Sequence, residues 1–301
     1  MQRSPIAPII HKHHWAGFDY CSRSVRARAP RLEPVVLVGG ALQRKEDWGR
    51  VERVMLESAD VIATDLPGWG EADLLPAEYG ADVLADALVH LLDDLGLERV
   101  NVLGGSYGTA IAYRMAQAYP DRIARMVLAG TMTAIPLHWE ETFREMVRLV
   151  AAGDLERFAD LVVAAITGGA PGSVVAAAAV QRVLARRFRT VGSDEAAKFI
   201  ANTRRLLAHA MIDTTTEPQP PILFTTGEHD TLTPPDACRE LARTCRRAWF
   251  TAITRSDHAV HLERGAELAD LMTRFFAGEP IDGLPYATAV EELGRAQSLK
   301  V

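Results

Sequence analysis

Three residues that lie far apart in the chain could together activate a serine for nucleophilic attack. Ser106 occupies the middle of the pattern Gly104-x-Ser106-x-Gly108, in which small residues on both sides permit a very tight turn. His258 is the candidate base that takes the hydroxyl proton, and Asp230 is the candidate acid that orients the histidine. The order serine, acid, histidine is one in which such triads occur. This pattern predicts attack by Ser106 on an acyl group.

Each of the two partner residues has a competitor nearby. Glu228 lies in the same loop as Asp230, but Asp230 lies deeper in it, just ahead of Thr233-Pro234, so we favour Asp230 as the acid. A turn cap before the prolines is the non-catalytic interpretation of Asp230. His261 follows His258 by one helical turn and is expected to pack on the helix. We favour His258 as the base because it lies at a junction between loop and helix, from which its ring can reach the serine.

A serine nucleophile also needs N–H donors where the negative oxygen of the tetrahedral intermediate forms. The backbone N–H of Tyr107 is one candidate, because it opens a helix whose free N–H groups face that point. The backbone N–H of Ala41 is the other, since Gly39-Gly40-Ala41 directly follows a buried apolar run at residues 34–38. The alternative interpretation is that the two glycines only end the strand.

The elements that must position these residues alternate as in a parallel sheet. Apolar runs predict strands at 34–38, 60–64, 100–105, 125–129, 221–226 and 247–253, most of them separated by helical patterns such as 44–58 and 79–95. An antiparallel hairpin is expected between Trp15 and Arg28, and a last core helix at 258–276 ahead of a polar tail. The predicted fold class is α/β, with a mostly parallel, doubly wound sheet of about eight strands. Ligands bind at the carboxyl ends of such strands, where Ser106 falls.

Residues 134–218 interrupt this alternation, because they carry helical patterns and no strand signal. We expect a lid over the strand ends, with extra scaffold helices as the alternative. The chain then divides into a discontinuous core, residues 1–133 and 219–301, and the inserted lid, residues 134–218. By position, the residues expected to bind substrate are Gly40, Leu42, Met132, Trp139, Phe143, Met146, Leu232 and Val260.

Composition narrows the class of protein. The chain has 301 residues, of which 48% are hydrophobic and 24% charged, and a net charge of −6. Such a mildly acidic chain without a basic stripe gives no reason to expect nucleic acid or an anionic membrane as a partner. We expect no membrane span, no signal peptide, three reduced cysteines and therefore a cytoplasmic protein. The histidines at 11–14 are expected on a loose, solvated arm, residues 1–13, rather than at a metal, and no metal or cofactor is expected.

Taken together, these residues resemble the α/β-hydrolase superfamily, particularly its cap-bearing esterases, epoxide hydrolases, C–C hydrolases and proline iminopeptidase-like enzymes. The resemblance runs from about residue 34 to residue 276. The segments that carry it are Asp65-Leu66-Pro67-Gly68-Trp69-Gly70, Gly104-Gly105-Ser106-Tyr107-Gly108, Gly227-Glu228-His229-Asp230 and His258-x-x-x-x-Glu263. It implies a Ser-His-Asp triad, an oxyanion hole and a helical cap.

The chain departs from this family in two places. Gly39-Gly40 stands where the family usually has His-Gly, and that histidine normally braces the oxyanion loop. Asp257 stands where a glycine commonly precedes the base. A serine nucleophile argues against the epoxide hydrolase and haloalkane dehalogenase branches, whose nucleophile is aspartate. The absence of His-Gly-Gly-Pro-Gly sets the chain apart from proline iminopeptidases.

Two functions remain open from the sequence. The first is a serine hydrolase that cleaves an ester, thioester, lactone or related acyl bond of a small, largely apolar substrate. The second keeps the fold without hydrolysis: a cofactor-free lyase, cyclase or acyltransferase acting on a specialised metabolite, or a binder of small ligands. The missing His-Gly and the charged segment 43–46 beside the site motivate the second function. The partner is a small molecule in both cases, and a homodimer is compatible with either.

Overall fold

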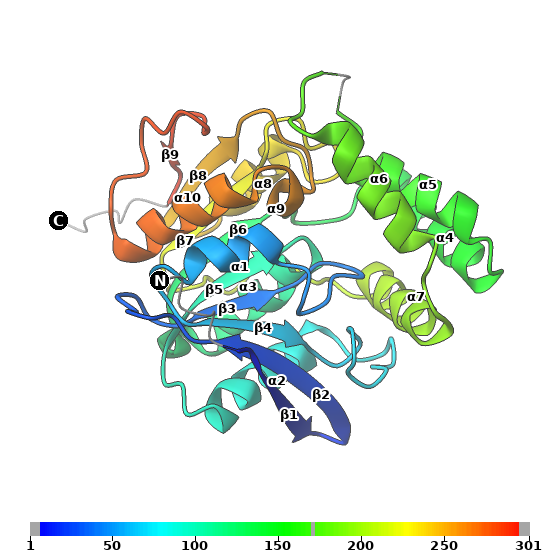
Figure 1. The fold of residues 1–301 in the computed structure, drawn as a ribbon, viewed down its shortest axis with the longest axis horizontal. Helices are drawn as coiled ribbons and strands as arrows, with labels where there is room; N and C mark the ends of the chain where they lie inside the picture. Colours follow the sequence, from blue (N-terminus) through cyan, green and yellow to red (C-terminus); the bar gives the residue numbers. More distant parts are fainter. Residues whose placement is uncertain (1–6, 170–171, 295–301) are drawn as a thin grey trace.

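The central element of the fold is a single mixed sheet. The computed structural model describes residues 7–169 and 172–294, and this part of the chain forms a nine-stranded sheet in the order β1-β2-β4-β3-β5-β6-β7-β8-β9 (Figure 1). The strands are β1 Ile9–Trp15, β2 Phe18–Val25, β3 Val35–Val38, β4 Val61–Asp65, β5 Val100–Gly105, β6 Ile123–Ala129, β7 Ile222–Gly227, β8 Ala248–Ile253 and β9 Glu291–Glu292. The strands from β4 to β8 are mutually parallel, while β1, β2 and β9 pair antiparallel at the two edges. The α/β class and the mostly parallel sheet are thus confirmed.

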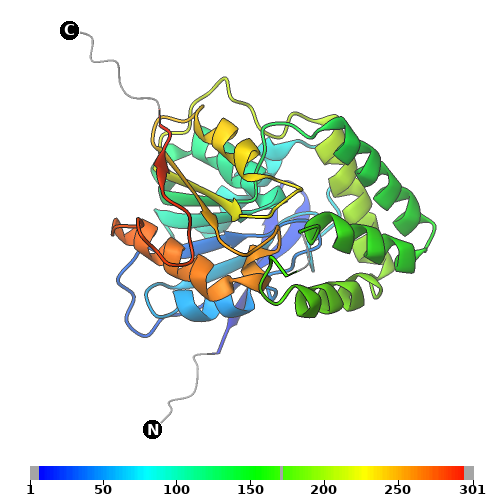
Figure 2. The ribbon, with the colours of Figure 1, turned by 90° about the horizontal axis from the view of Figure 1, so that it is seen from above.

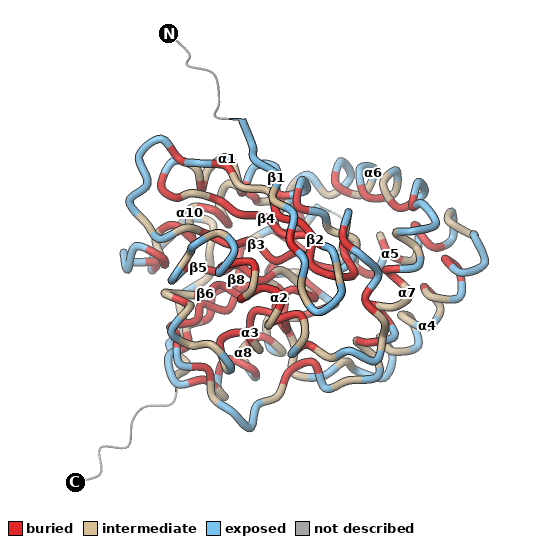
Figure 3. The backbone as a smooth tube through the Cα atoms, turned by 90° about the horizontal axis from the view of Figure 1, so that it is seen from below, coloured by how far each residue is buried: buried red, intermediate tan, exposed pale blue. Residues whose placement is uncertain are grey.

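Helices cover both faces of the sheet, which explains why the central strands are apolar along their whole length. On one face, α2 Ala81–Asp94, α3 Tyr107–Ala118 and α8 Pro235–Ala242 share a core with the strands, and a 3-10 turn, Pro120–Arg122, follows α3. On the other face lie α1 Gly49–Met55 and α10 Gly265–Ala277, preceded by the short α9 Val260–Glu263. Figure 3 shows the buried residues concentrated in the strands and in the inner sides of these helices.

Between β6 and β7 the chain leaves the sheet and forms a separate helical layer. This layer consists of α4 Leu137–Ala151, α5 Leu155–Ile166, α6 Ala177–Phe188 and α7 Ser193–Ala208. The helices pack on one another around a core of their own, in which Phe158 is fully buried. Figure 2 shows them grouped at one side of the molecule, beyond the end of the sheet. They occupy the segment that the sequence predicts to be helical.

The sheet has nine strands, close to the expected number of about eight. The extra strand, β9, lies in the segment predicted as a polar tail and pairs with β8 through Trp249 and Glu292. A further bridge joins Ile253 to Ala287. A strand of two residues with polar side chains carries no hydrophobic alternation, so this pairing could not be predicted from the sequence. The predicted helix at 258–276 also divides into α9 and α10.

The N-terminal prediction is wrong in part. Strand β1 begins at Ile9, so the whole histidine run belongs to the edge hairpin and not to a loose arm. His13 is buried, and its ring is hydrogen bonded to Asp94 at 2.8 Å and to Ser22 at 2.9 Å. The reason is the alternation of side chains along a strand, which turns every second residue toward the core. Residues 1–6 of the predicted arm lie outside the described part of the chain.

The described helices contain none that is long and apolar enough to cross a bilayer. The cysteines Cys21, Cys238 and Cys245 are buried and form no disulfide.

Candidate active site

Ser106 lies on the tight turn between β5 and α3. Its backbone has φ +49° and ψ −116°, a conformation that side chains rarely adopt and that persists only where the surrounding structure enforces it. The neighbouring glycines allow it: a Cβ on Gly104 would lie 2.6 Å from the Gly108 carbonyl oxygen, and one on Gly108 would lie 2.3 Å from that of Val38. The turn therefore requires glycine at both positions and presents the serine hydroxyl at the carboxyl end of the sheet.

The predicted base and acid meet the serine in a chain of hydrogen bonds. His258 Nε2 lies 2.9 Å from Ser106 Oγ, and His258 Nδ1 lies 2.9 Å from Asp230 Oδ2. Because an ionised carboxylate only accepts hydrogen bonds, the proton of a neutral His258 belongs on Nδ1. Nε2 is then free to accept the proton of the serine hydroxyl. Segments after β5, β7 and β8 thus meet at one point above the sheet.

Asp230 is held as a carboxylate by a dense set of donors. Its Oδ1 accepts the backbone N–H groups of Leu232 and Thr233, and its Oδ2 accepts the hydroxyls of Thr226 and Thr233. Burial opposes the charge, but the positive charge of His258 and these hydrogen bonds outweigh it and hold the pKa of Asp230 below its usual value. The acid is therefore ionised throughout the pH range in which the histidine titrates.

Thr233 belongs to the site, although sequence reasoning treated it only as a landmark. Its Oγ1 lies 2.6 Å from Asp230 Oδ2 and 3.0 Å from His258 Nδ1, so it bridges the acid and the base. Burial lowers the pKa of His258. The charge of Asp230 and its hydrogen bond raise this pKa by more than burial lowers it, so the net shift is upward. The Thr-Pro pair after Asp230 was the signal in the sequence, but the bridging geometry depends on a loop 25 residues further along the chain.

The competing residues lie elsewhere. Glu228 is exposed and accepts the backbone N–H of Arg255 at 3.0 Å, away from the base. His261 packs beside the indole of Trp48, with ring centroids 6.0 Å apart, and burial together with the charge of His258 lowers the pKa of His261 to about 4. Neither residue is bonded to Ser106 or Asp230 in the described structure.

Asp257, the other departure from the family pattern, turns away from the serine. Its carboxylate accepts the N–H of Gly169 at 2.6 Å and the N–H of His258 at 2.8 Å. The charged side chain therefore ties the loop that carries the base to the loop after α5. Burial raises the pKa of Asp257, while these two N–H groups act in the opposite direction.

The two predicted oxyanion donors flank the serine. Tyr107 begins helix α3, and Gly40 packs so closely that a Cβ on it would lie 3.1 Å from Ser106 Cβ. Among the hydrogen bonds of the described residues, the backbone N–H groups of Ala41 and Tyr107 have no acceptor. Both residues line the pocket above Ser106. The site therefore offers two free donors next to the nucleophile.

The pocket above Ser106 has a volume of about 710 Å³, which falls in the range of small-molecule sites. Residues from the sheet side and from all four of the helices α4–α7 line it. Of the residues predicted to bind substrate, those in the wall are Gly40, Leu42, Met132, Phe143, Met146, Leu232 and Val260.

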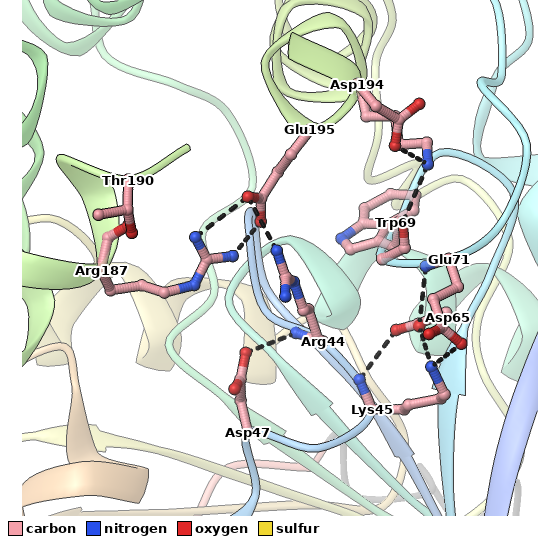
Figure 4. Close-up of polar contacts among 12 residues, drawn as sticks. Arg44, Lys45, Asp47, Asp65, Trp69, Glu71, Arg187, Thr190, Asp194 and Glu195 are labelled. Carbon is pink, nitrogen blue, oxygen red and sulfur yellow. Dashed lines mark hydrogen bonds and ion pairs between the residues drawn. The ribbon is translucent and has the colours of Figure 1, made fainter. Parts of the chain in front are cut away.

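The remaining predicted residue, Trp139, is not among the described residues of the pocket wall. Its indole stacks on Phe143 with ring centroids 6.2 Å apart, so it supports the wall from behind. In the segment 43–46, Gln43 is in the pocket wall, whereas the charged Arg44, Lys45 and Glu46 are not among its described residues. Lys45 is buried in an ion-pair cluster with Asp65 and Glu71, each at 2.8 Å from its Nζ (Figure 4). Its charge therefore stabilises a turn and does not reach the pocket.

The fold and the sequence place this chain in a family. A profile of the alpha/beta hydrolase fold matches residues 33–265, more than half of the chain, so the protein belongs to the α/β hydrolase family. The solved structures that it resembles include MGS-M2, an alpha/beta hydrolase enzyme from a Medee basin deep-sea metagenome library. The TM-score is 0.77 at 19% sequence identity, and the match covers 91% of this chain and 100% of that one. An enol-lactonase from Burkholderia xenovorans LB400 gives a TM-score of 0.76 at 20% identity, with coverage of 89% of this chain and 100% of that one.

Curated relatives share a shorter stretch of sequence. The chain is 36% identical over 103 residues to a 2-hydroxy-6-oxononadienedioate/2-hydroxy-6-oxononatrienedioate hydrolase 2 from Pseudomonas putida. It is 34% identical over 102 residues to a 2-hydroxymuconate semialdehyde hydrolase from Pseudomonas sp. strain CF600. In each case the match covers 33% of this chain and 36% of the relative, about a third of each protein.

Proposed function

We propose that this protein is a serine hydrolase that cleaves an ester, thioester or lactone of a small, largely apolar substrate through an acyl-enzyme. The observation that carries the proposal is the continuous hydrogen-bonded chain from Ser106 through His258 to Asp230 at the floor of a pocket. Each of the three side chains is in contact with the next at a distance that permits proton transfer or orientation.

In the proposed reaction, Ser106 Oγ attacks the acyl carbon while its proton passes to His258 Nε2. The carbonyl oxygen becomes an oxyanion, which the N–H groups of Ala41 and Tyr107 stabilise. The protonated His258 then gives its proton to the leaving oxygen or sulfur, and the acyl group stays on the serine. A water molecule, deprotonated by His258, attacks the acyl-enzyme and releases the acid. Asp230 stays ionised throughout and stabilises the imidazolium.

The wall of the pocket favours a neutral, apolar substrate. Met132, Leu232 and Val260 lie on the core side, while Phe143 and Met146 come from α4. Such a wall favours the burial of an aliphatic or aromatic group.

The charges of the wall support the same substrate class. Arg187 lines the pocket, but Glu195 lies between the guanidinium groups of Arg187 and Arg44 and pairs with both (Figure 4). Glu140 and Asp47 also line the pocket, so the described wall offers no cation in excess of its carboxylates. A substrate with a free carboxylate would therefore lose hydration without gaining a full ion pair.

The sequence relatives suggest a second reaction for the same residues. Their names describe hydrolases of dienedioates and of a muconate semialdehyde, which act on carbon–carbon bonds. Ser106 and His258 could cleave such a bond only if the pocket accepts the acidic substrate. The charge of the wall disfavours acidic substrates, whereas the sequence similarity favours them. The test therefore includes both neutral esters and acidic substrates.

The first experiment is titration with a fluorophosphonate probe, read by intact mass, on the wild type and on the variants Ser106→Ala and His258→Ala. Labelling of the wild type alone, at one probe per chain, would establish an activated Ser106. Short-chain p-nitrophenyl esters and a 2-hydroxy-6-oxo-dienedioate are then compared by kcat/KM to separate the two substrate classes. A folded wild type that is not labelled would contradict the hydrolase, and the non-hydrolytic functions would replace it.

A further inference from the structure

The peptide unit between Gly40 and Ala41 is held in one orientation by hydrogen bonds to its carbonyl oxygen. The Gly40 oxygen accepts from the indole Nε1 of Trp69 at 2.9 Å and from the backbone N–H of Gln43 at 3.2 Å. The described chain contains no cis peptide bond. In a trans peptide the C=O and N–H groups point in opposite directions. The position of the Trp69 indole therefore decides where the N–H of Ala41 points.

That direction is away from the indole. Ala41 and Tyr107 are in the pocket wall, whereas Trp69 is not among its described residues. The Trp69 indole lies behind the wall and packs edge-on against the ring of Tyr107, with centroids 5.1 Å apart. Because the Gly40 carbonyl points to this indole, the Ala41 N–H points away from it, and Gly40 itself packs so closely on the serine that a Cβ there would lie 3.1 Å from Ser106 Cβ.

Gln43 holds the same loop from its other side. Its Oε1 accepts the backbone N–H of Gly40 at 3.0 Å. The loop needs such support, because Leu42 has φ +60°, a left-handed conformation that is unfavourable for a residue other than glycine. The Nε2 of Gln43 is buried and has no partner among the described residues, which is a further cost. Gln43 therefore acts on this loop through its side-chain oxygen, which fixes the Gly40 N–H.

Trp69 is itself rigidly held, as an orienting donor must be. It belongs to the turn after β4, in which the Asp65 carboxylate accepts from the N–H and the Nζ of Lys45, both at 2.8 Å (Figure 4). On the other side of the turn, Lys198 of α7 donates to the Gly70 carbonyl at 2.9 Å. Asn202 of the same helix donates to the Gly68 carbonyl at 2.8 Å. The indole is therefore fixed before any substrate binds.

We infer that Trp69 and Gln43 are positioning residues, which aim the Ala41 N–H at the oxyanion of the tetrahedral intermediate. They brace the loop in this chain, in which Gly39-Gly40 replaces the usual His-Gly. The inference rests on the proposed hydrolysis, because only a negative oxygen above Ser106 needs this donor. Loss of either brace should weaken binding of the transition state and leave binding of the neutral substrate largely intact.

The test is Trp69→Phe, which removes the indole donor and keeps an aromatic ring against Tyr107. With p-nitrophenyl butyrate we expect kcat to fall about tenfold, less than the roughly 10²–10³-fold loss that follows removal of an oxyanion donor outright. KM should change less than about twofold. A short-chain trifluoromethyl ketone, to which Ser106 adds to form an oxyanion while His258 takes the proton, should lose affinity by the same factor as kcat.

Gln43→Met supplies a second variant that removes the other brace without touching the tryptophan, in case Trp69→Phe folds poorly. Gln43 is itself in the pocket wall, so kcat and ketone affinity, and not KM, are compared for this variant. Trp249→Phe is the matched control, because Trp249 packs on Phe275 in the β8–α10 core and is not among the described residues of the pocket wall. We expect Trp249→Phe to retain wild-type kcat.

Unchanged kcat and unchanged ketone affinity in folded Trp69→Phe and Gln43→Met would overturn the inference, and so would a rise in KM alone. If the wild type itself neither hydrolyses the ester nor binds the ketone, the proposed hydrolase fails, and the positioning role fails with it. If the wild type does both and the variants match it, only the positioning role fails.

Discussion

Replacement of Asp230 by asparagine should reverse the tautomer of His258. The two backbone N–H groups of Leu232 and Thr233 both point at Asp230 Oδ1, so the amide oxygen of the asparagine must take that position. The amide NH₂ then occupies the place of Oδ2, 2.9 Å from His258 Nδ1, and donates a hydrogen bond to it. Nδ1 becomes an acceptor, the ring proton moves to Nε2, and Nε2 can no longer accept the proton of Ser106.

The magnitude follows from what this change leaves intact. The serine turn, both oxyanion donors and the pocket are untouched, so the residual rate is that of binding and oxyanion stabilisation without a base. The equivalent change in a Ser-His-Asp protease lowers kcat by about 10⁴-fold. We expect a loss of the same order here, which corresponds to about 5 kcal/mol of transition-state stabilisation.

The assay is kcat/KM on a p-nitrophenyl ester, with Glu228→Gln as the matched control. Glu228 lies two residues away in the same loop and loses the same charge on substitution, but its carboxylate contacts only the exposed N–H of Arg255 among the hydrogen bonds described. We expect this control to stay within about twofold of the wild type. If folded Asp230→Asn keeps more than about a tenth of wild-type activity, the tautomer argument is wrong. If Glu228→Gln causes the large loss, the acid has been misassigned.

Three further outcomes are expected. Asp230 raises the pKa of His258 above its ordinary value of 6.5. Activity should disappear as the pH falls through this pKa, because only neutral His258 accepts the serine proton. A pH profile of kcat/KM measures the midpoint. Lys45→Met should lower the free energy of unfolding by about 3–5 kcal/mol in urea titration, because it leaves the buried Asp65 carboxylate without its cation. Burial raises the pKa of Glu263 from its ordinary value of 4.5 to about 7. Between these two pH values the folded protein holds a proton that the unfolded chain has lost. The stability of the folded protein therefore declines as the pH rises from 4.5 to about 7. Glu263→Gln should therefore raise Tm more at about pH 8 than at about pH 5.

Each of these outcomes can fail separately. An acid limb centred below the ordinary histidine value would show that Asp230 does not act on His258 as the geometry indicates. Equal stability of Lys45→Met and wild type would mean that water replaces the cation beside Asp65. A gain in Tm from Glu263→Gln that does not depend on pH would show that packing, and not titration, limits stability there.

The sequence could predict the site where the chemistry depends on local geometry. The glycines around Ser106 are required by contacts of a turn within a few residues, and the strand before it and the helix after it are equally local. Asp230 and His258 could be predicted because each follows a buried strand, and parallel strands end at one edge of the sheet. The bridging role of Thr233 could not be predicted in the same way, since it depends on the distance between two loops.

The sequence predictions failed where the direction of a side chain, or a contact distant in sequence, decides a residue's surroundings. Trp139 has the residue type and the position expected of a pocket wall, but its indole stacks on Phe143 one turn along α4. His13 has the polar neighbours of a surface residue, yet its burial depends on Asp94 at the end of α2. Residue type and periodicity indicate which face of an element is apolar, but they do not show which polar residues find partners inside.

Helix α7 shows the physical reason most clearly. Lys198, Asn202 and Arg205 recur at helical spacing, and such a polar stripe would ordinarily be assigned to solvent. All three are buried, because their donors reach backbone carbonyls of the irregular segment 68–79, which has no strand partner to satisfy them. Arg205 alone donates to the carbonyls of Leu75, Pro76 and Tyr79. This segment includes Trp69. The polar face of α7 therefore fixes the turn that carries the Trp69 indole, and the indole orients the loop of Ala41. A helix that the sequence places in a covering layer is thereby part of the support of the proposed catalytic site.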